Sequence, residues 1–280
     1  MSSYLPNLQA LSNADHKHIR ALQKRSEREH QRLCVLEGAH LCKEYAQYRE
    51  HTPQASIEIH SLVVVNDNHS NDDAISPEVA RLVNELAAWG APVYGTSAHK
   101  FALLCDTATP QGILAVIDLP ERPLTAAEPL LVLDGVADPG NVGTIIRTAD
   151  WFGVRNILLG QGCADRFHPK TLRATMGSVF RCAIHSTPNL ADTLHTSFAD
   201  YTLWGASLQG AQTLGQISQK AAKAKGKYGL VMGNEARGIS LDVLECLTET
   251  FKIHGGQSGV ESLNVAVAAG IILHEMTGCR

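Results

Sequence analysis

The sequence lacks the patterns that mark membrane proteins, disulfide scaffolds and metal centres. Its longest apolar runs fall well short of the roughly 20 residues that a membrane-spanning helix needs. No charged segment followed by an apolar run and a cleavage site opens the sequence, so we expect no secretory signal. The seven cysteines form no CxxC pair, and the thirteen histidines include no HExxH pattern. Odd, scattered cysteines are typical of reduced thiols in the cytosol. We therefore expect a cytoplasmic protein with no membrane contact and no bound metal.

The chain also lacks an excess of basic residues, since 24 Lys and Arg stand against 28 Asp and Glu. A net charge of −4 argues against a protein that coats nucleic acid indiscriminately, but a local basic patch can still contact phosphates. Residues 15–33 are predicted to form a helix that carries such a patch. Its basic face comprises Lys17, Arg20, Lys24 and Arg28. The alternative for this face is an ordinary solvated helix surface.

The 280 residues suggest one large domain or two modest ones. After the basic N-terminal segment at 1–31, residues 32–118 alternate short apolar strands with helices and predict a small α/β domain. Residues 119–129 hold three prolines and predict a linker. Residues 130–280 alternate strands and helices more regularly, which predicts a mostly parallel sheet covered on both faces.

The stretch "DPGNVGTIIRTAD" at 138–150 follows a buried strand of this second unit, at the place where α/β proteins bind cofactors. It contains neither GxGxxG nor GxxxxGK[ST], because Gly140 and Gly143 give only GxxG. A dinucleotide or P-loop site is therefore not predicted. We expect Asn141 to cap a helix that leaves Arg147 off its apolar stripe.

Two later turns carry similar residue types. "MGNEARGIS" at 232–240 follows a buried strand, and "GVESLNVAVAAGIILHE" at 259–275 leads into an apolar helix for which Ser262 is the expected N-cap. Ligands of open α/β sheets bind at the carboxyl ends of the strands. We therefore expect the three turns to form one site at that edge.

Three motifs in this order, N-V-G-x-x-x-R-T-A, M-G-N-E-x-x-G-I and E-S-L-N-V-A-V-A-A-G, resemble the signature motifs of the SpoU (TrmH) family. These are RNA ribose 2′-O-methyltransferases of the SPOUT superfamily, and the resemblance covers about residues 130–277. It implies an α/β fold of the SPOUT type, with a mostly parallel sheet and a C-terminal deep trefoil knot. It also implies S-adenosylmethionine as methyl donor, a homodimer, and an N-terminal substrate-binding domain like small RNA-binding ribosomal proteins.

The resemblance also implies the site residues. Contacts to the cofactor are expected from Gly233, Ile253 and Leu263. Catalytic roles are expected for Arg147, Asn141, Glu235, Ser262 and Asn264. Because a guanidinium is a poor base, we expect Arg147 to stabilise the developing alkoxide or to clamp the neighbouring phosphate. The chain departs from the family after Ile253, where His254 replaces the usual proline and the spacing to Glu261 is one residue longer.

The N-terminal domain favours ribosomal RNA as the substrate, with transfer RNA as the alternative. Two other classes of protein stay open at this point. One is a protein that binds RNA and cofactor without turnover, which stays an alternative because the loop at 253–259 departs from the family pattern. The other is a small-molecule enzyme with a nucleotide cofactor, against which the missing glycine fingerprints argue.

Overall fold

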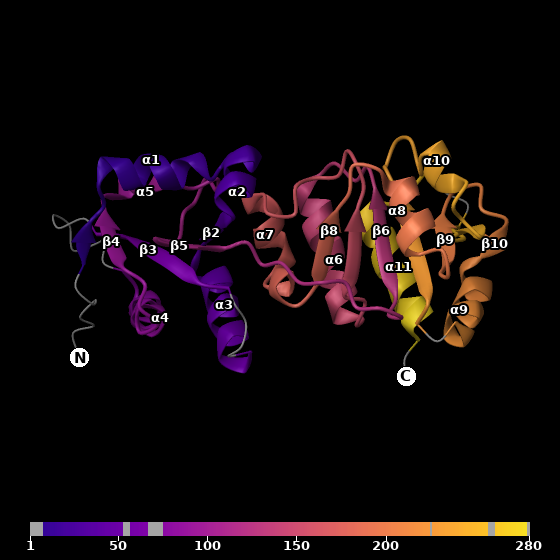
Figure 1. The fold of residues 1–280 in the computed structure, drawn as a ribbon, viewed down its shortest axis with the longest axis horizontal. Coiled ribbons are helices and arrows are strands. Elements are labelled where there is room, and N and C mark those ends of the chain that lie inside the picture. Colours follow the sequence, from indigo (N-terminus) through magenta and orange to yellow (C-terminus); the bar gives the residue numbers. More distant parts are fainter. Residues whose placement is uncertain (1–7, 53–56, 67–74, 225, 257–260, 279–280) are drawn as a thin grey trace. The chain divides into compact units, whose positions relative to one another are not determined.

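The fold is taken from a computed structural model, which describes residues 8–52, 57–66, 75–224, 226–256 and 261–278 (Figure 1). The chain forms two compact units. The first contains residues 1–120 together with 167–180, and the second contains residues 121–166 and 181–280. Segment 167–180 thus belongs by its contacts to the N-terminal unit, although it lies between two strands of the other unit in the sequence.

The described part of the first unit is a five-stranded sheet with strand order β1-β4-β3-β5-β2. The strands are β1 (Gln9–Ala10), β2 (Leu33–Glu37), β3 (Ile59–Val65), β4 (Val93–Thr96) and β5 (Ile113–Asp118). The helices are α1 (Asn13–Ala21), α2 (Arg25–Gln31), α3 (Ala39–His51), α4 (Pro77–Ala87), α5 (Ala98–Ala102) and α7 (Pro169–Thr175), with a 3-10 turn η1 (Ser178–Phe180). Strands and helices alternate along this unit, which confirms the predicted small α/β domain. Strand β5 runs antiparallel to β2 and β3.

The single helix expected over 15–33 is wrong, because the chain breaks it into α1 and α2. Residues Leu22 to Lys24 turn between the two, and Leu22 is buried with Ile19 in the core of the unit. The turn brings Arg28 back to the end of α1, where its Nη1 donates to the carbonyls of Leu22 (2.7 Å) and Gln23 (2.8 Å). Arg28 is only 2 % exposed, so its predicted place on the basic outer face is also wrong. Its guanidinium satisfies carbonyls that the end of a helix leaves without partners.

The second unit has a sheet with strand order β10-β12-β9-β11-β6-β7-β8, in which every described pair is parallel. Its strands are β6 (Leu130–Asp134), β7 (Asn156–Leu159), β8 (Ala183–Ser186), β9 (Thr202–Ala206), β10 (Gln212–Thr213), β11 (Tyr228–Gly233) and β12 (Glu249–Lys252). The predicted mostly parallel sheet is confirmed. Leu130 to Leu133 of β6 are fully buried, as expected for a parallel strand covered on both faces.

Helices cover both faces of this sheet (Figure 1). They are α6 (Pro139–Trp151), α8 (Leu190–Ser197), α9 (Leu214–Lys223), α10 (Leu241–Leu244) and α11 (Val265–Thr277). Helices α8 and α10 pack on the face that presents Leu130, Val132 and Leu158. Helix α11 packs beside α6 and α9 and lies behind the sheet in Figure 1. No helix within the described ranges is long and apolar enough to span a membrane.

Two helix caps differ from those expected. Helix α6 begins at Pro139, and its cap is Asp138, whose Oδ1 accepts from the backbone N–H of Asn141 at 2.9 Å. Helix α11 is capped by Asn264 and not by Ser262, since Asn264 Oδ1 accepts from the N–H groups of Ala266 and Val267. The first change leaves the whole side chain of Asn141 available for other contacts. The cap of α11 uses only the Oδ1 atom of Asn264 and leaves its Nδ2 group available to donate.

Candidate methyl-transfer site

The turns after β6 and β11 lie side by side, because these two strands are parallel neighbours in the sheet. Asn234 Nδ2 donates to the carbonyl of Gly135 at 2.8 Å, and the Ser240 N–H donates to Asp134 Oδ2 at 2.7 Å. Asn234 Oδ1 also accepts from two N–H groups of its own turn, and Asn234 and Gly238 exchange two backbone hydrogen bonds. The turn that carries Glu235 is therefore fixed both internally and to the end of β6.

A chain of three polar side chains connects all three sequence motifs. Asn264 Nδ2 donates to Asn141 Oδ1 at 3.1 Å, and Asn141 Nδ2 donates to Glu235 Oε1 at 2.8 Å. The direction of this chain follows from the cap of α11, because Asn264 Oδ1 already accepts from backbone N–H groups and only Nδ2 is left to donate. Asn141 therefore accepts at Oδ1 and donates from Nδ2, so Glu235 is the final acceptor of the chain.

The Glu235 carboxylate is exposed, and its second oxygen, Oε2, has no hydrogen-bond partner among the residues that the structure describes. An oriented carboxylate with a free oxygen can accept a hydrogen bond, and a proton, from a hydroxyl group. The predicted grouping of Asn141, Glu235 and Asn264 is confirmed as geometry. Their roles in catalysis stay a prediction.

Two other predicted residues are not joined to this chain. Arg147 is exposed on α6, six residues beyond Asn141, which places it about 9 Å further along the helix axis. Its side chain makes no ion pair or hydrogen bond with any described residue. Ser262 is also exposed and has no hydrogen-bond partner within the described part of the chain. Arg147 is thus free to meet a group that the chain itself does not provide.

The residues expected to hold the cofactor lie at the same edge of the sheet. Gly233 ends β11, Ile253 follows β12, and Leu263 lies just before α11. Residues 257–260 of the atypical loop lie outside the described residues. Two exposed leucines that sequence reasoning missed follow neighbouring strands: Leu208 after β9 and Leu241 at the start of α10. Apolar side chains beside backbone turns suit the adenine ring and the aliphatic part of S-adenosylmethionine, so the residues present fit this cofactor.

Cys163 lies near the end of β6, where its thiol donates to the carbonyl of Leu133 at 3.1 Å. Burial raises the pKa of this thiol to about 11, so it stays protonated at neutral pH and is no nucleophile. No group of three or more His, Cys, Asp or Glu side chains within the described ranges is placed to hold a metal ion. The side chains that join the three motifs carry amide and carboxylate groups.

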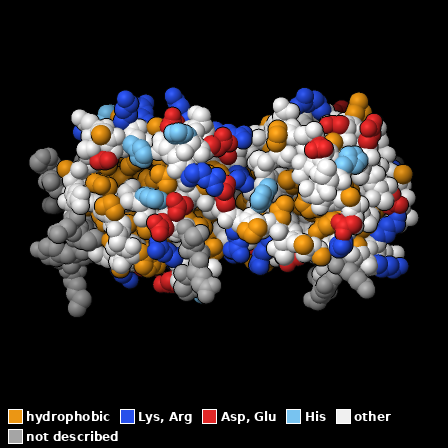
Figure 2. All heavy atoms as spheres, in the orientation of Figure 1, with side chains coloured by type: hydrophobic (Ala, Val, Ile, Leu, Met, Phe, Trp, Pro, Cys, Tyr) orange, Lys and Arg blue, Asp and Glu red, His pale blue; other side chains and the backbone are white. Residues whose placement is uncertain are grey.

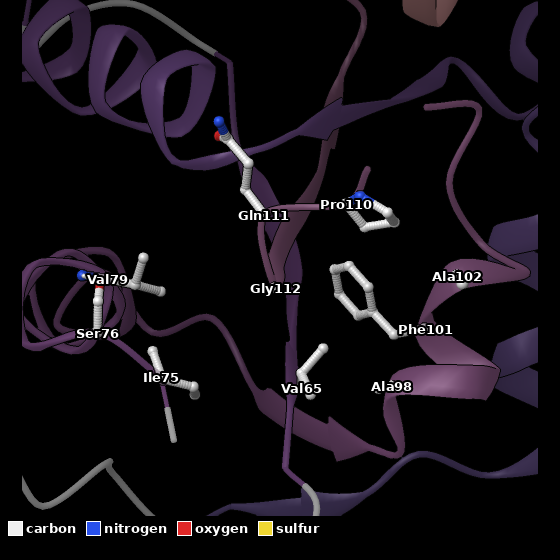
Figure 3. A pocket seen from close by; sticks show the side chains of 10 residues that line it. All are labelled: Val65, Ile75, Ser76, Val79, Ala98, Phe101, Ala102, Pro110, Gln111 and Gly112. Carbon is white, nitrogen blue, oxygen red and sulfur yellow. Dashed lines mark hydrogen bonds between the residues drawn. The ribbon is translucent and has the colours of Figure 1, made fainter. Parts of the chain in front are cut away.

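A separate cavity of about 320 Å³ lies in the first unit, between α4 and α5 (Figure 3). Most of the side chains that line it are apolar, with Val65 and Phe101 facing Val79 across it, and Ser76 and Gln111 add polar groups. None of the residues of the three motifs lines this cavity. It is therefore distinct from the candidate methyl-transfer site.

Comparison with known proteins now places the chain in a family. A model of the SpoU rRNA Methylase family matches residues 128–274. This chain belongs to that family. Residues 13–115 also match the MRM3-like substrate binding domain. The predictions of a SpoU-type RNA methyltransferase and of an N-terminal substrate-binding domain are thus confirmed.

Similarity to other proteins of the family extends over most of this chain. The 23S rRNA (guanosine(2553)-2′-O)-methyltransferase RlmP of Bacillus subtilis is 31% identical over 277 residues, which cover 98% of this chain and 100% of the relative. RlmB of Photorhabdus laumondii, a 23S rRNA (guanosine-2′-O-)-methyltransferase, is 29% identical over a match that covers 86% of this chain and 96% of the relative. The AdoMet-bound rRNA methyltransferase of Sinorhizobium meliloti superposes with a TM-score of 0.76 at 28% identity, covering 96% of each chain.

Proposed function

We propose that this family member transfers the methyl group of S-adenosylmethionine to a ribose 2′-hydroxyl of ribosomal RNA. The observation that carries the proposal is the hydrogen-bonded chain Asn264–Asn141–Glu235, which unites the three motifs at the carboxyl edge of the sheet. The names of the Bacillus and Photorhabdus relatives support a ribose of ribosomal RNA as the substrate. The AdoMet-bound Sinorhizobium structure supports the cofactor, which Gly233, Ile253 and Leu263 would hold.

When bound, S-adenosylmethionine supplies a methyl group that its sulfonium charge already activates. Glu235 Oε2 accepts the hydrogen of the ribose 2′-hydroxyl, and it takes the proton as the new carbon–oxygen bond forms and the carbon–sulfur bond breaks. Asn141 and Asn264 orient this carboxylate. The Arg147 guanidinium stabilises the developing alkoxide or the neighbouring phosphate. Ser262 orients the ribose.

We also propose a homodimer whose interface lies beside Arg147. Helices α6 and α11 pack together with Gly270 against Thr148. On their outer side, Trp151 is 84 % exposed, and Val267 and Ile271 are exposed as well. Apolar side chains grouped on two neighbouring helices are typical of a surface that a second copy covers. Because Arg147 lies one turn before Trp151, each methyl-transfer site would be completed at this interface, and the C-terminal segment would form the trefoil knot of the superfamily.

The N-terminal unit is proposed to bind the RNA through the exposed face of α1. Lys17 and Arg20 are exposed on α1, Lys24 is exposed in the turn that follows it, and Figure 2 shows Lys and Arg side chains along the upper edge over this helix. The His16 ring lies 3.0 Å from the carbonyl of Lys100, which brings the exposed Lys100 of α5 to the same surface. Replacing these four basic residues together should weaken RNA binding and flatten its salt dependence. Unchanged binding would leave α1 as an ordinary solvated face.

A cytoplasmic location completes the proposal. It is supported by Cys42, Cys105, Cys163, Cys182 and Cys246, none of which forms a disulfide.

Mapping of ribose methylation across total RNA tests the function, in cells that lack this protein and in cells complemented with wild type or Arg147→Ala. We expect one ribosomal mark to be lost, restored by wild type and not by the variant. Purified Arg147→Ala should still bind S-adenosylmethionine with nearly wild-type affinity. Loss of a transfer-RNA mark would favour the alternative substrate. An unchanged methylation map, with cofactor and RNA still bound, would favour a binding protein without turnover.

A further inference from the structure

Segment 167–180 connects β7 to β8 in the sequence, yet it is part of the N-terminal unit. It forms α7 and η1. The MRM3-like substrate-binding match ends at residue 115, and the segment falls within the SpoU match at 128–274. The substrate-binding unit is therefore completed by a piece of chain from the methyltransferase half.

An ionic contact holds the start of this segment. Arg173 donates from Nη1 to Glu37 Oε2 and from Nη2 to Asp106 Oδ2, both at 2.7 Å. The Glu37 side chain at the end of β2 is only 2% exposed, and it also accepts from the N–H groups of Asp106 and Thr107. A buried carboxylate needs a cation or several donors to offset its lost hydration. Arg173 is the cation that supplies this compensation, and its planar fork spans two separate carboxylates.

An aromatic contact holds the end of the segment. Phe180 is fully buried, and its ring lies 5.6 Å from that of Tyr48 and 5.7 Å from that of Tyr45, both on α3. Between the two anchors, Gly177 has a φ of +85° and passes so close to α3 that a Cβ atom there would lie 2.5 Å from Glu44 Oε2. Only glycine satisfies both conditions without strain. Three independent features thus fit the segment to α3 and β2.

The segment begins directly after a loop of the second unit that is hydrogen-bonded to the end of β6. In that loop, the Gly160 N–H donates to the carbonyl of Leu133 at 2.8 Å, and the Ala164 N–H donates to that of Val136 at 2.9 Å. The turn after β6 is the one that leads to Asn141. The loop that leads into the segment is therefore hydrogen-bonded to the strand and turn that precede Asn141.

We propose that Arg173 and Phe180 are positioning residues for RNA methylation, because they clamp a segment of the methyltransferase half into the substrate-binding unit. This inference rests on the proposed function for its catalytic consequence, but not for the clamp itself. The linker at 119–129 is then not the only link between the units. Loosening the clamp should lower turnover, because RNA held by the first unit no longer reaches the site in a fixed orientation.

The clamp is tested with full-length chains that carry a protease site in the linker at 119–129. After cleavage, the two wild-type fragments should elute together in gel filtration. The fragments of an Arg173→Met/Glu37→Gln variant with Phe180→Ala should separate. The paired substitution removes the ion pair without leaving a buried charge, and Lys43→Ala on the exposed side of α3 is the matched control. Separation of the wild-type fragments would overturn the clamp.

The catalytic consequence is measured on uncut chains. Arg173→Met/Glu37→Gln without the phenylalanine change should reduce kcat by about tenfold or more, while the Kd values for RNA and for S-adenosylmethionine stay within about twofold of wild type. Wild-type kcat would overturn the positioning role, and so would a loss confined to RNA affinity. If wild type itself methylates no RNA, the proposed function fails, while the fragment experiment still decides whether the clamp exists.

Discussion

Gly233→Ala should disrupt the turn that holds Glu235. A Cβ atom on Gly233 would lie 2.3 Å from the carbonyl carbon of Gly238 and 2.4 Å from the nitrogen of Ile239. Both are backbone atoms, so no side chain can rotate away. Ordinary contact distances start near 3.4 Å, and the turn would have to retreat by about 1 Å.

That movement breaks the two backbone hydrogen bonds between Asn234 and Gly238, which measure 3.0 and 2.9 Å. Each is worth about 1 kcal/mol, and overpacking adds about 1–3 kcal/mol. The free energy of unfolding should therefore fall by about 3–5 kcal/mol. At roughly 2–4 °C per kcal/mol, Tm should fall by about 6–20 °C. Affinity for S-adenosylmethionine should fall as well, since Gly233 is an expected cofactor contact.

The assay pairs differential scanning calorimetry with isothermal titration of S-adenosylmethionine. Gly215→Ala is the control, because a Cβ atom at Gly215 in α9 meets nothing within 4 Å. Alanine there should leave Tm unchanged or raise it slightly, since it favours the helix by about 1 kcal/mol over glycine. Wild-type Tm and wild-type cofactor affinity in Gly233→Ala would refute the reasoning.

Three further outcomes are expected. Asn264→Asp keeps an oxygen to cap α11 but cannot donate a hydrogen bond to Asn141. Tm should therefore stay at the wild-type value while turnover falls about a hundredfold. A large fall in Tm together with the fall in turnover would contradict this. Trp151→Glu should convert the dimer to a monomer in light scattering, whereas Leu103→Glu, an exposed leucine of the first unit, should not; a Trp151→Glu dimer would count against the interface. Burial raises the pKa of Cys42 from 9.0 to about 12, so only the unfolded chain loses this proton just above pH 9 and stability falls as pH rises further. Cys42→Ala should flatten the decline of Tm between about pH 9 and 11, and an unchanged slope would exclude this thiol as a cause.

The sequence by itself determined the order of the main strands and helices and the parallel character of the second sheet. Both follow from local patterns, because a strand buried on both faces must be an unbroken apolar run such as Leu130 to Leu133. It also pointed to the three turns that carry the candidate site, since the carboxyl ends of parallel strands share one edge.

Only the tertiary structure decided which polar side chains meet and which residues cap the helices. Asn141 contacts a residue 94 positions away, and Asn264 contacts one 123 positions away. A nearby residue can cap a helix in place of the expected one, as Asp138 caps α6 in place of Asn141. Arg28 and Arg173 illustrate the same limit. Each is a basic side chain in a helix, and only the carbonyls or carboxylates that the fold brings to it decide whether it faces solvent or a buried partner.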